Sequence, residues 1–258
     1  MRVFFIGDIF GRPGREMIYA HLPELLREKQ IDFTVANGEN VTGGFGISRK
    51  HFNELVDCGV DAFTMGNHVW DNKEIYRYID QEPRMVRPAN FHHSLPGKGW
   101  RAYDVNGRKL VIVNLIGRVF LPASDCPFAK MDAILEEVKD AAILVDLHAE
   151  ATSEKIAMGW HLDGRVSAVV GTHTHVQTND ARILPRGTGY LTDAGMTGPR
   201  DSVLGVEKEI ILERFRTGFS PRFEAATGDR QLNGIIFDIG ENNRCTNVEL
   251  INFWEPAF

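Results

Sequence analysis

Five short, largely apolar runs lie in the first two thirds of the chain, and polar residues that can bind a metal ion or carry a proton end or closely follow each of them. The runs occupy residues 3–6, 33–36, 62–65, 143–147 and 166–170. Runs of this length are typical of buried β-strands. The polar residues are, in chain order, Asp8, Glu39, Asn40, Asn67, His68, His148, His173 and His175. Such groups at the carboxyl ends of several strands are typical of the functional site of an open α/β sheet.

The first half of the chain alternates between strand and helix patterns. The pattern predicts strands at 2–7, 32–37 and 62–65, helices beginning near 13 and 48, and a short helix ending near 80. Ser48 is the expected N-cap of the second helix, and Asp71 or Asn72 that of the third. We expect Pro23 to kink or split the first helix. This βαβαβ rhythm predicts parallel strands joined by right-handed crossovers.

The second half adds antiparallel signals. Asn106-Gly107 between the β-like segments 101–105 and 109–115 predicts a hairpin. Later segments predict helices at 131–142 and 152–160, strands ending at 148 and at 171, and β-rich stretches at 221–225, 232–239 and 246–253. We expect the glycine-containing stretch 195–200 to form a mobile lip near the site. The pattern therefore predicts an α/β fold with two packed mixed β-sheets flanked by helices, as a single domain over residues 1–258.

Charge and composition exclude several classes of partner. The net charge is −6 and 25% of residues are charged, which argues against a stable nucleic-acid complex or binding to an anionic membrane surface. The cysteines are few, odd in number and scattered, which indicates a reducing compartment without a disulfide framework. Gly7 and Asp8 interrupt the first apolar run too early for a signal peptide, and no apolar stretch approaches a membrane span. We expect a cytoplasmic protein, and the sequence leaves its oligomeric state open.

The donor residues fit a centre with more than one metal ion. Without His68 they offer seven oxygen or nitrogen donors and no sulfur, and seven donors are more than one ion needs from protein. Two divalent ions carry more positive charge than the two carboxylates cancel, so the site would attract a phosphate. Glu39 can bridge both ions, and a water acidified by both is the natural nucleophile. We expect two ions per chain, iron or manganese first and zinc as the alternative, although the donor types do not choose among these metals.

The same blocks resemble a known superfamily. The successive motifs of calcineurin-like metallophosphoesterases are matched by Gly7-Asp8, Gly66-Asn67-His68, His148 and Gly171-Thr-His-Thr-His175. Within that superfamily the chain resembles the YmdB-type phosphodiesterases, which are associated with hydrolysis of 2′,3′-cyclic nucleotides. Supporting stretches lie at 38–40, 64–71, 86–91, 146–154, 170–178 and 193–198. The resemblance implies a two-sheet sandwich and an enzyme that hydrolyses small phosphodiesters.

The resemblance also implies a role for each donor. One ion would be held by Asp8, Glu39, Asn40 and His175, and the other by Glu39, Asn67, His148 and His173. His68 would be the general acid beside the leaving group. The chain departs from the general superfamily pattern in two places that the YmdB-type subgroup shares. Phe10 stands where a histidine is usual, with Asn40 as its apparent replacement, and Glu39 stands where the bridging residue is usually an aspartate.

Other interpretations of the same residues remain open. Asp8 could cap the helix that follows it, and Asn40 and Asn67 could be turn residues. Asp146 and Glu150 flank His148 and are expected to orient it. Two other function classes also use such residues. One is an amidohydrolase, although its fold places the H-x-H motif after the first strand of an eight-fold barrel. The other is a metal-dependent regulatory or RNA-binding protein with little turnover.

Overall fold

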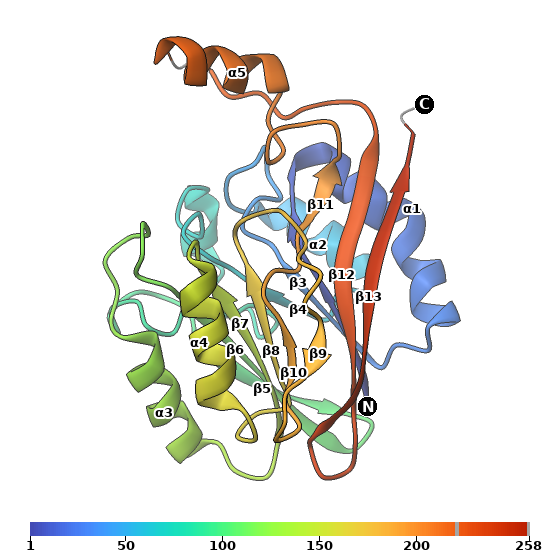
Figure 1. Cartoon of the computed structure of the whole chain (residues 1–258), viewed down its shortest axis with the longest axis vertical. Coiled ribbons are helices and arrows are strands. Elements are labelled where there is room, and N and C mark those ends of the chain that lie inside the picture. Colours follow the sequence, from blue (N-terminus) through green and yellow to red (C-terminus); the bar gives the residue numbers. More distant parts are fainter. Residues whose placement is uncertain (220–221, 257–258) are drawn as a thin grey trace.

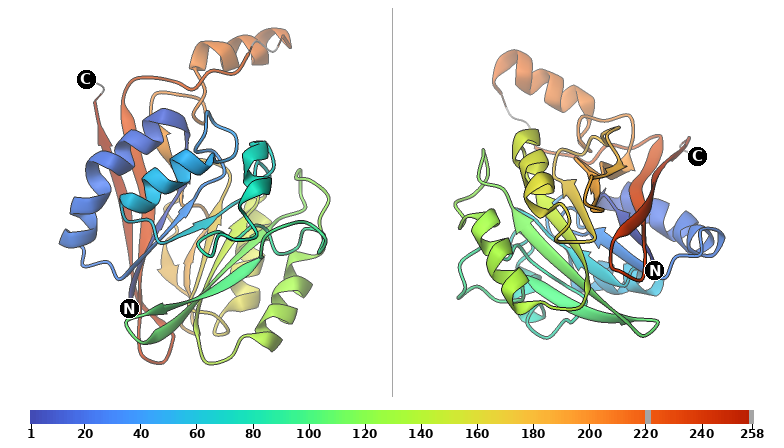
Figure 2. Two further views of the ribbon diagram at one scale, coloured as in Figure 1. Left: turned by 180° about the vertical axis from the view of Figure 1, so that it is seen from behind. Right: turned by 60° about the horizontal axis from the view of Figure 1, so that its bottom comes forward.

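Two β-sheets packed face to face form the centre of the molecule, and helices cover both outer faces (Figures 1 and 2). The computed structural model describes residues 1–219 and 222–256. The first sheet has the strand order β2 (Asp8–Ile9), β11 (Met196–Pro199), β12 (Arg230–Ile239), β1 (Arg2–Ile6), β3 (Phe33–Asn37) and β4 (Ala62–Thr64), and β13 (Cys245–Glu255) also pairs with β12. The second has the order β5 (Trp100–Val105), β6 (Arg108–Ile116), β7 (Ala142–His148), β8 (Ala168–Thr172), β10 (Gly189–Leu191) and β9 (Arg182–Ile183).

The helices divide between the two sheets. The outer face of the first sheet is covered by α1 (Gly11–Glu28) and α2 (Arg49–Asp57), and that of the second by α3 (Pro127–Glu137) and α4 (Thr152–Leu162). A 3₁₀-helix, η1 (Lys73–Arg77), follows β4. The remaining helix of the described residues, α5 (Lys208–Thr217), projects from one end of the sandwich in every view (Figures 1 and 2). The expected two-sheet α/β sandwich is therefore confirmed, and it differs from the eight-fold barrel of an amidohydrolase.

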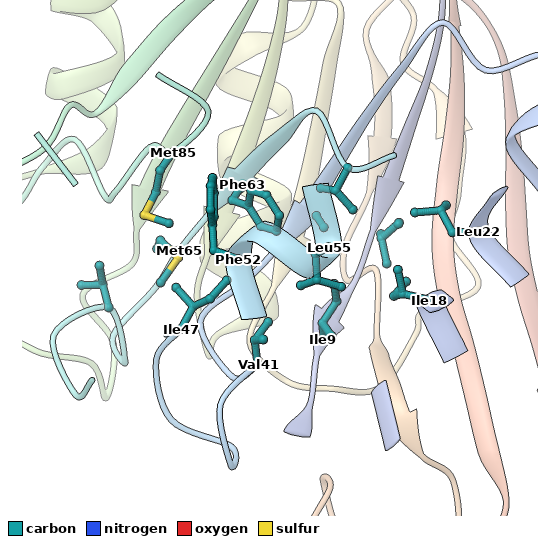
Figure 3. Close-up of a cluster of buried hydrophobic side chains, with 14 of the residues drawn as sticks. Ile9, Ile18, Leu22, Val41, Ile47, Phe52, Leu55, Phe63, Met65 and Met85 are labelled. Carbon is teal, nitrogen blue, oxygen red and sulfur yellow. The ribbon is translucent and has the colours of Figure 1, made fainter. Parts of the chain in front are cut away.

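Strand periodicity explains how the layers adhere. Val3 and Phe5 of β1 point into the core between the sheets, where Leu144 and Val170 of the second sheet meet them. Phe4, between them in sequence, faces the other way and packs in the layer beneath the helices. Successive side chains on a strand alternate between faces, so one strand serves two cores. Figure 3 shows part of the outer core, where Phe52 and Leu55 of α2 and Ile18 and Leu22 of α1 pack with side chains of the sheet.

Parallel pairing brings strand ends together. In the first sheet β1, β3 and β4 run parallel, and in the second β6, β7, β8 and β10 do. The expected parallel core is confirmed. The hairpin is confirmed too, with β5 antiparallel to β6 and positive φ angles at Asn106 and Gly107, as a two-residue hairpin turn requires. No helix within residues 1–219 and 222–256 is both long enough and apolar enough to cross a bilayer.

Three helix predictions had different outcomes. Ser48 caps α2 as expected, accepting a hydrogen bond from the backbone N–H of His51. Asn72 caps the short helix after β4, although that helix is 3₁₀ and ends at Arg77. Helix α1 continues through Pro23 instead of splitting there. Its apolar residues on both sides of the proline pack against the first sheet, and this burial offsets the missing hydrogen bond.

Several segment predictions were wrong. The helix expected at 131–142 spans Pro127–Glu137, because proline favours the first helical turn and the chain turns extended at Val138 before β7. The expected mobile lip at 195–200 contains the buried strand β11, which pairs with β2 and β12. Within 221–225, Pro221 lies outside the described residues, and 222–225 contributes an isolated bridge rather than a strand. Helix α5 and the short strands β9 and β10 were not predicted.

Candidate metal centre

The expected donor residues converge at the carboxyl ends of strands from both sheets. Asp8 begins β2 just beyond β1, and Glu39 and Asn40 follow β3. His148 is the last residue of β7, and the H-x-H turn follows β8. Parallel strands end at the same edge of a sheet, and the face-to-face packing of the sheets brings the two edges together. Residues far apart in the sequence therefore share one site.

Glu39, His148 and His173 form the tightest group. Glu39 Oε1 lies 3.0 Å from His148 Nε2, and His173 Nδ1 lies 3.0 Å from the same nitrogen. One donor atom from each of the three residues lies within 4.8 Å of the others. Asn67 Oδ1 is also 3.0 Å from His148 Nε2. These are the four residues expected to hold one of the two ions, and their donor atoms point to a common centre.

Asp8 and His175 form a neighbouring group. The separation between Asp8 Oδ1 and His175 Nε2 is 4.0 Å. Asp8 Oδ2 accepts a hydrogen bond from the backbone N–H of His173, so the two groups are joined through the H-x-H turn. His175 Nδ1 faces the carbonyl oxygen of Leu204 at 3.0 Å, which leaves Nε2 directed at Asp8. This pair fits the other expected ion.

Asn40 has a structural role as well as a free oxygen. Its amide nitrogen donates to the carbonyl of Gly44 at 2.9 Å, which stabilises the turn after Glu39. Its Oδ1 is buried and has no hydrogen-bond partner among the described residues. The turn interpretation therefore accounts for the nitrogen and not for the oxygen. An amide oxygen left free in this way is available as a ligand.

The donor set fits divalent metal ions. Asp8 Oδ1 and Asn40 Oδ1 are both buried, and neither has a hydrogen-bond partner within the described part of the chain. Unpartnered buried oxygens are costly and require an explanation, and a bound cation supplies one. Gly66 supports the same arrangement, because a Cβ there would collide with Glu39 Oε2 and the His148 ring. The glycine lets the chain pass close behind both donors while Asn67 reaches the centre.

Neighbouring hydrogen bonds orient His148. Its Nδ1 contacts Thr172 Oγ1 at 2.9 Å, and that hydroxyl donates to Asp146 Oδ1 at 2.7 Å. Since the hydroxyl proton is used for Asp146, the hydroxyl accepts from Nδ1–H, and Nε2 is left for a metal. Asp146 thus orients His148 as expected, through Thr172. Glu150 instead contacts His173 Nε2 at 3.1 Å, so the expectation that it orients His148 was wrong.

The close packing of charged groups shifts their pKa values. For Glu39, burial opposes ionisation, but the nearby His148 imidazolium outweighs burial and lowers the pKa to about 2. For His148, burial favours the neutral ring, but the Glu39 carboxylate raises the pKa to about 9. Burial raises the pKa of Asp8 well above its usual range. Burial, followed by the charge of His148, lowers the pKa of His173 to about 3. In the protein without metal, His148 therefore keeps its proton at neutral pH, whereas Glu39 and His173 are deprotonated.

His68 lies beside the centre and faces a different way. Its backbone N–H donates to Glu39 Oε2 at 2.9 Å, which fixes the residue next to the Glu39 carboxylate. Its Nδ1 lies 2.8 Å from Asp71 Oδ2, and its ring meets the Phe45 ring edge-on at 5.1 Å between centroids. The interaction with Asp71, which was not anticipated, favours Nδ1–H and leaves Nε2 free to exchange a proton.

A cavity of about 570 Å³ opens over these residues. Its floor includes Glu39, Asn40, His173 and His175, and His68 lies in its wall. A second wall, which is mainly apolar, comes from residues within 203–215 and 223–225. Its larger side chains are Leu204, Ile211, Arg214, Phe215 and Phe223. This volume is within the ~300–1,000 Å³ range of small-molecule sites. No local motif pointed to this wall, since its residues act through their position alone.

The comparisons with known proteins agree with this architecture. A family model described as "YmdB-like protein" matches residues 4–251. The chain is 50% identical to a Bacillus subtilis 2′,3′-cyclic-nucleotide 2′-phosphodiesterase, covering 95% of this chain and 93% of the relative. It superposes with a TM-score of 0.95 on the crystal structure of a Mycoplasma pneumoniae phosphatase, at 35% identity over 100% of this chain and 94% of that one. A Thermus thermophilus 5′-nucleotidase precursor, at 12% identity and TM-score 0.62 over 99% of this chain and 54% of that one, shares the fold. The resemblance stated from the motifs is thus confirmed, and the chain belongs to the YmdB-like protein family.

Proposed function

We propose that the protein is a metal-dependent phosphodiesterase that opens 2′,3′-cyclic nucleotides to monoesters. Two divalent ions and the general acid His68 would carry the reaction. The observation that carries the proposal is that two of the clustered donors, Glu39 and His173, line one cavity with His68, and that the second wall of this cavity is apolar and aromatic. A phosphodiester could then meet the donor group while its organic part contacts the wall.

Family membership supports the class of reaction. The chain shares its fold and at least 35% of its sequence with a phosphatase of known structure and with a curated phosphodiesterase. This kinship supports a phosphoesterase activity. The cyclic-nucleotide substrate is supported by the similarity to the Bacillus subtilis 2′,3′-cyclic-nucleotide 2′-phosphodiesterase and by the lining of this cavity.

The donor groups would each hold one ion. Asn67, His148 and His173 would bind the first, Asp8, Asn40 and His175 the second, and Glu39 both. Iron or manganese suits these oxygen and nitrogen donors, with zinc as the alternative. When bound, such ions neutralise the phosphate and lower the pKa of water, which makes a nucleophile available at neutral pH. Glu39 suits the bridging role because its two oxygens already face different residues, His148 and the His68 backbone.

His68 would protonate the departing ribose oxygen. An alkoxide is a poor leaving group, so a proton delivered as the P–O bond breaks lowers the barrier. Asp71 accepts a hydrogen bond from Nδ1–H, and this leaves Nε2–H as the donor.

The apolar wall would hold the nucleoside. Phe45, whose ring contacts that of His68, lines the cavity together with Phe215 and Phe223. Aromatic side chains stack on nucleobases with little regard to the identity of the base. Arg214, whose guanidinium lies 5.6 Å from the Phe223 ring centroid, adds a positive charge to this wall. The wall therefore favours a nucleotide over a small inorganic or alkyl phosphate.

A substrate panel on metal-analysed protein tests the proposal. We expect 2′,3′-cyclic nucleotides to be opened to a monoester that is not readily hydrolysed further, and bis(p-nitrophenyl) phosphate to be cleaved with added Mn²⁺. Faster release of phosphate from ordinary monoesters than opening of the cyclic diester would contradict the substrate class. If fully metal-loaded protein turned over no phosphodiester, the regulatory interpretation would replace the enzymatic one.

A further inference from the structure

A buried ion pair lies behind the H-x-H turn, outside the donor set. Lys155 Nζ of α4 lies 2.5 Å from Asp193 Oδ2, and both side chains are 1% exposed. Neither residue lines the cavity over the donor groups. A buried charge pair costs desolvation that its attraction need not repay, so such a pair is weak evidence for stability. Its contacts indicate what else it does.

Asp193 is bonded to the turn that carries two donor histidines. Its Oδ2 accepts hydrogen bonds from the backbone N–H of Thr174 at 3.2 Å and from the Thr174 hydroxyl at 2.7 Å. Thr174 lies between His173 and His175, whose φ angles are +99° and +62°. Positive φ is unfavourable for residues other than glycine, and it persists only where surrounding contacts enforce it. Asp193 supplies those contacts at the centre of the turn.

The same carboxylate also reaches the segment that carries Asp8. Asp193 Oδ1 accepts from the backbone N–H of Gly195 at 2.8 Å. The carbonyl of Gly195 in turn accepts from the backbone N–H of Asp8 at 3.0 Å. The approach is close, since a Cβ at Gly7 would collide with that carbonyl. One carboxylate thus ties together the chain segments of Asp8, His173 and His175.

Lys155 is the counter-charge that keeps this arrangement balanced. Its aliphatic stem passes Gly171, where a Cβ would lie 2.8 Å from Lys155 Cδ. An ionised Asp193 has no proton to donate, so both oxygens can accept from the two loops at once. Without the lysine, the carboxylate would be buried with no compensating positive charge.

We propose that Lys155 and Asp193 are positioning residues that hold the H-x-H turn and Asp8 in the geometry that binds metal. The pair sets metal affinity without touching an ion. This inference rests on the metal-binding part of the proposed function. It predicts that breaking the pair weakens metal binding even where the fold survives.

Calorimetric titration of metal-free protein with Mn²⁺ tests this. We expect about 10- to 100-fold weaker binding in Lys155→Met and in Asp193→Asn, as is typical when a group that orients metal ligands is removed. Thr174→Val keeps the side-chain shape and removes a single hydrogen bond to Asp193. It should weaken binding by roughly 2- to 10-fold, and it carries the test if the charge variants do not fold.

Arg230→Met is the matched control. Arg230 makes ion pairs with Glu16 and Glu255 away from the donor groups, so its loss should lower thermal stability and leave Mn²⁺ affinity unchanged. Unchanged affinity in the folded Lys155, Asp193 and Thr174 variants would overturn the positioning role alone. An equal loss of affinity in Arg230→Met would also overturn it, by showing that general destabilisation suffices. If the unaltered protein bound no Mn²⁺, both the proposed metal centre and this inference would be overturned.

Discussion

Glu39 and His148 lie in contact across the interface between the two sheets. Glu39 follows β3 of the first sheet and His148 ends β7 of the second, yet their Oε1 and Nε2 atoms are 3.0 Å apart and both side chains are fully buried. A charged pair in that position would be costly if it served stability alone. Its place at the centre of the other donor residues makes it the natural focus of a metal site.

Replacing Glu39 tests the two-ion arrangement. Glu39→Gln removes one negative charge and one of the two bridging oxygens, so we expect loss of at least one ion per chain and of nearly all activity. Elemental analysis of purified protein measures the ions directly. Glu82→Gln is a suitable control, because Glu82 is also buried but pairs with Arg49 away from the site. If the unaltered protein were fully active with a single ion per chain, the two-ion arrangement would be contradicted.

His68→Ala separates proton donation from metal binding. We expect two ions to remain and the rate of chemistry on a cyclic nucleotide to fall by ~10²–10⁴-fold. The loss should be much smaller for a p-nitrophenyl diester, because p-nitrophenolate leaves with little need for a proton. Asp71→Asn should show the same contrast in weaker form, since it removes the charge that faces His68 Nδ1. Loss of metal in His68→Ala would make the residue a ligand, and equal slowing of both substrates would favour phosphate binding.

Phe215→Ala tests the apolar wall. Stacking on a base is worth ~1–3 kcal/mol, so we expect KM for 2′,3′-cyclic AMP to rise by roughly 5- to 150-fold. KM for methyl ribofuranoside 2′,3′-cyclic phosphate, which has no base, should change little. Phe120→Ala is the control, because Phe120 is exposed and does not line the cavity. An equal rise in KM for both substrates would assign Phe215 a role other than binding the base.

Asp180 provides a pH-dependent contribution to stability. Burial would raise its pKa, but hydrogen bonds from Thr192 and Thr178 prevail and lower it. A carboxyl whose pKa is lower in the folded state stabilises the fold above the unfolded pKa of ~3.9, and this stability is lost as pH falls toward the folded value. Asp180→Asn should therefore be less stable than the unaltered protein at pH 7, with a gap that closes below about pH 4. Urea unfolding across this range checks it, and a gap that is constant with pH would refute it.

Local patterns identified the donor residues and missed their supports. Glu39, Asn67, His148 and His173 follow apolar runs, so their place at strand ends could be inferred from sequence neighbours. Lys155 could not be inferred in this way. In the sequence it is one charged residue on a helix, and only the packing of α4 on the second sheet buries it against Asp193. Phe215 is a similar case, because its place in the cavity lining depends on where α5 projects.

The backbone predictions also divide into those that depend on local residues and those that depend on distant ones. The Asn106-Gly107 hairpin and the Ser48 cap were predicted because each depends on a few adjacent residues. The stretch 195–200 was expected to be mobile from its glycine and proline content. It is instead a buried strand, because β2 and β12 provide hydrogen-bond partners on both sides. Partners distant in sequence overrode the local preference.

By itself the sequence determined the alternation of strands and helices that makes a parallel core, and it placed the polar residues at the carboxyl ends of the strands. Both follow from periodicity over short windows. The tertiary structure alone decided that Glu39 meets His148, that Asp193 links the turns of Asp8 and the H-x-H motif, and that α5 stands over the cavity. These relationships cross from one sheet to the other or from a helix to a distant loop. Their distances are set by how the side chains between the sheets pack, and that packing depends on the whole chain at once.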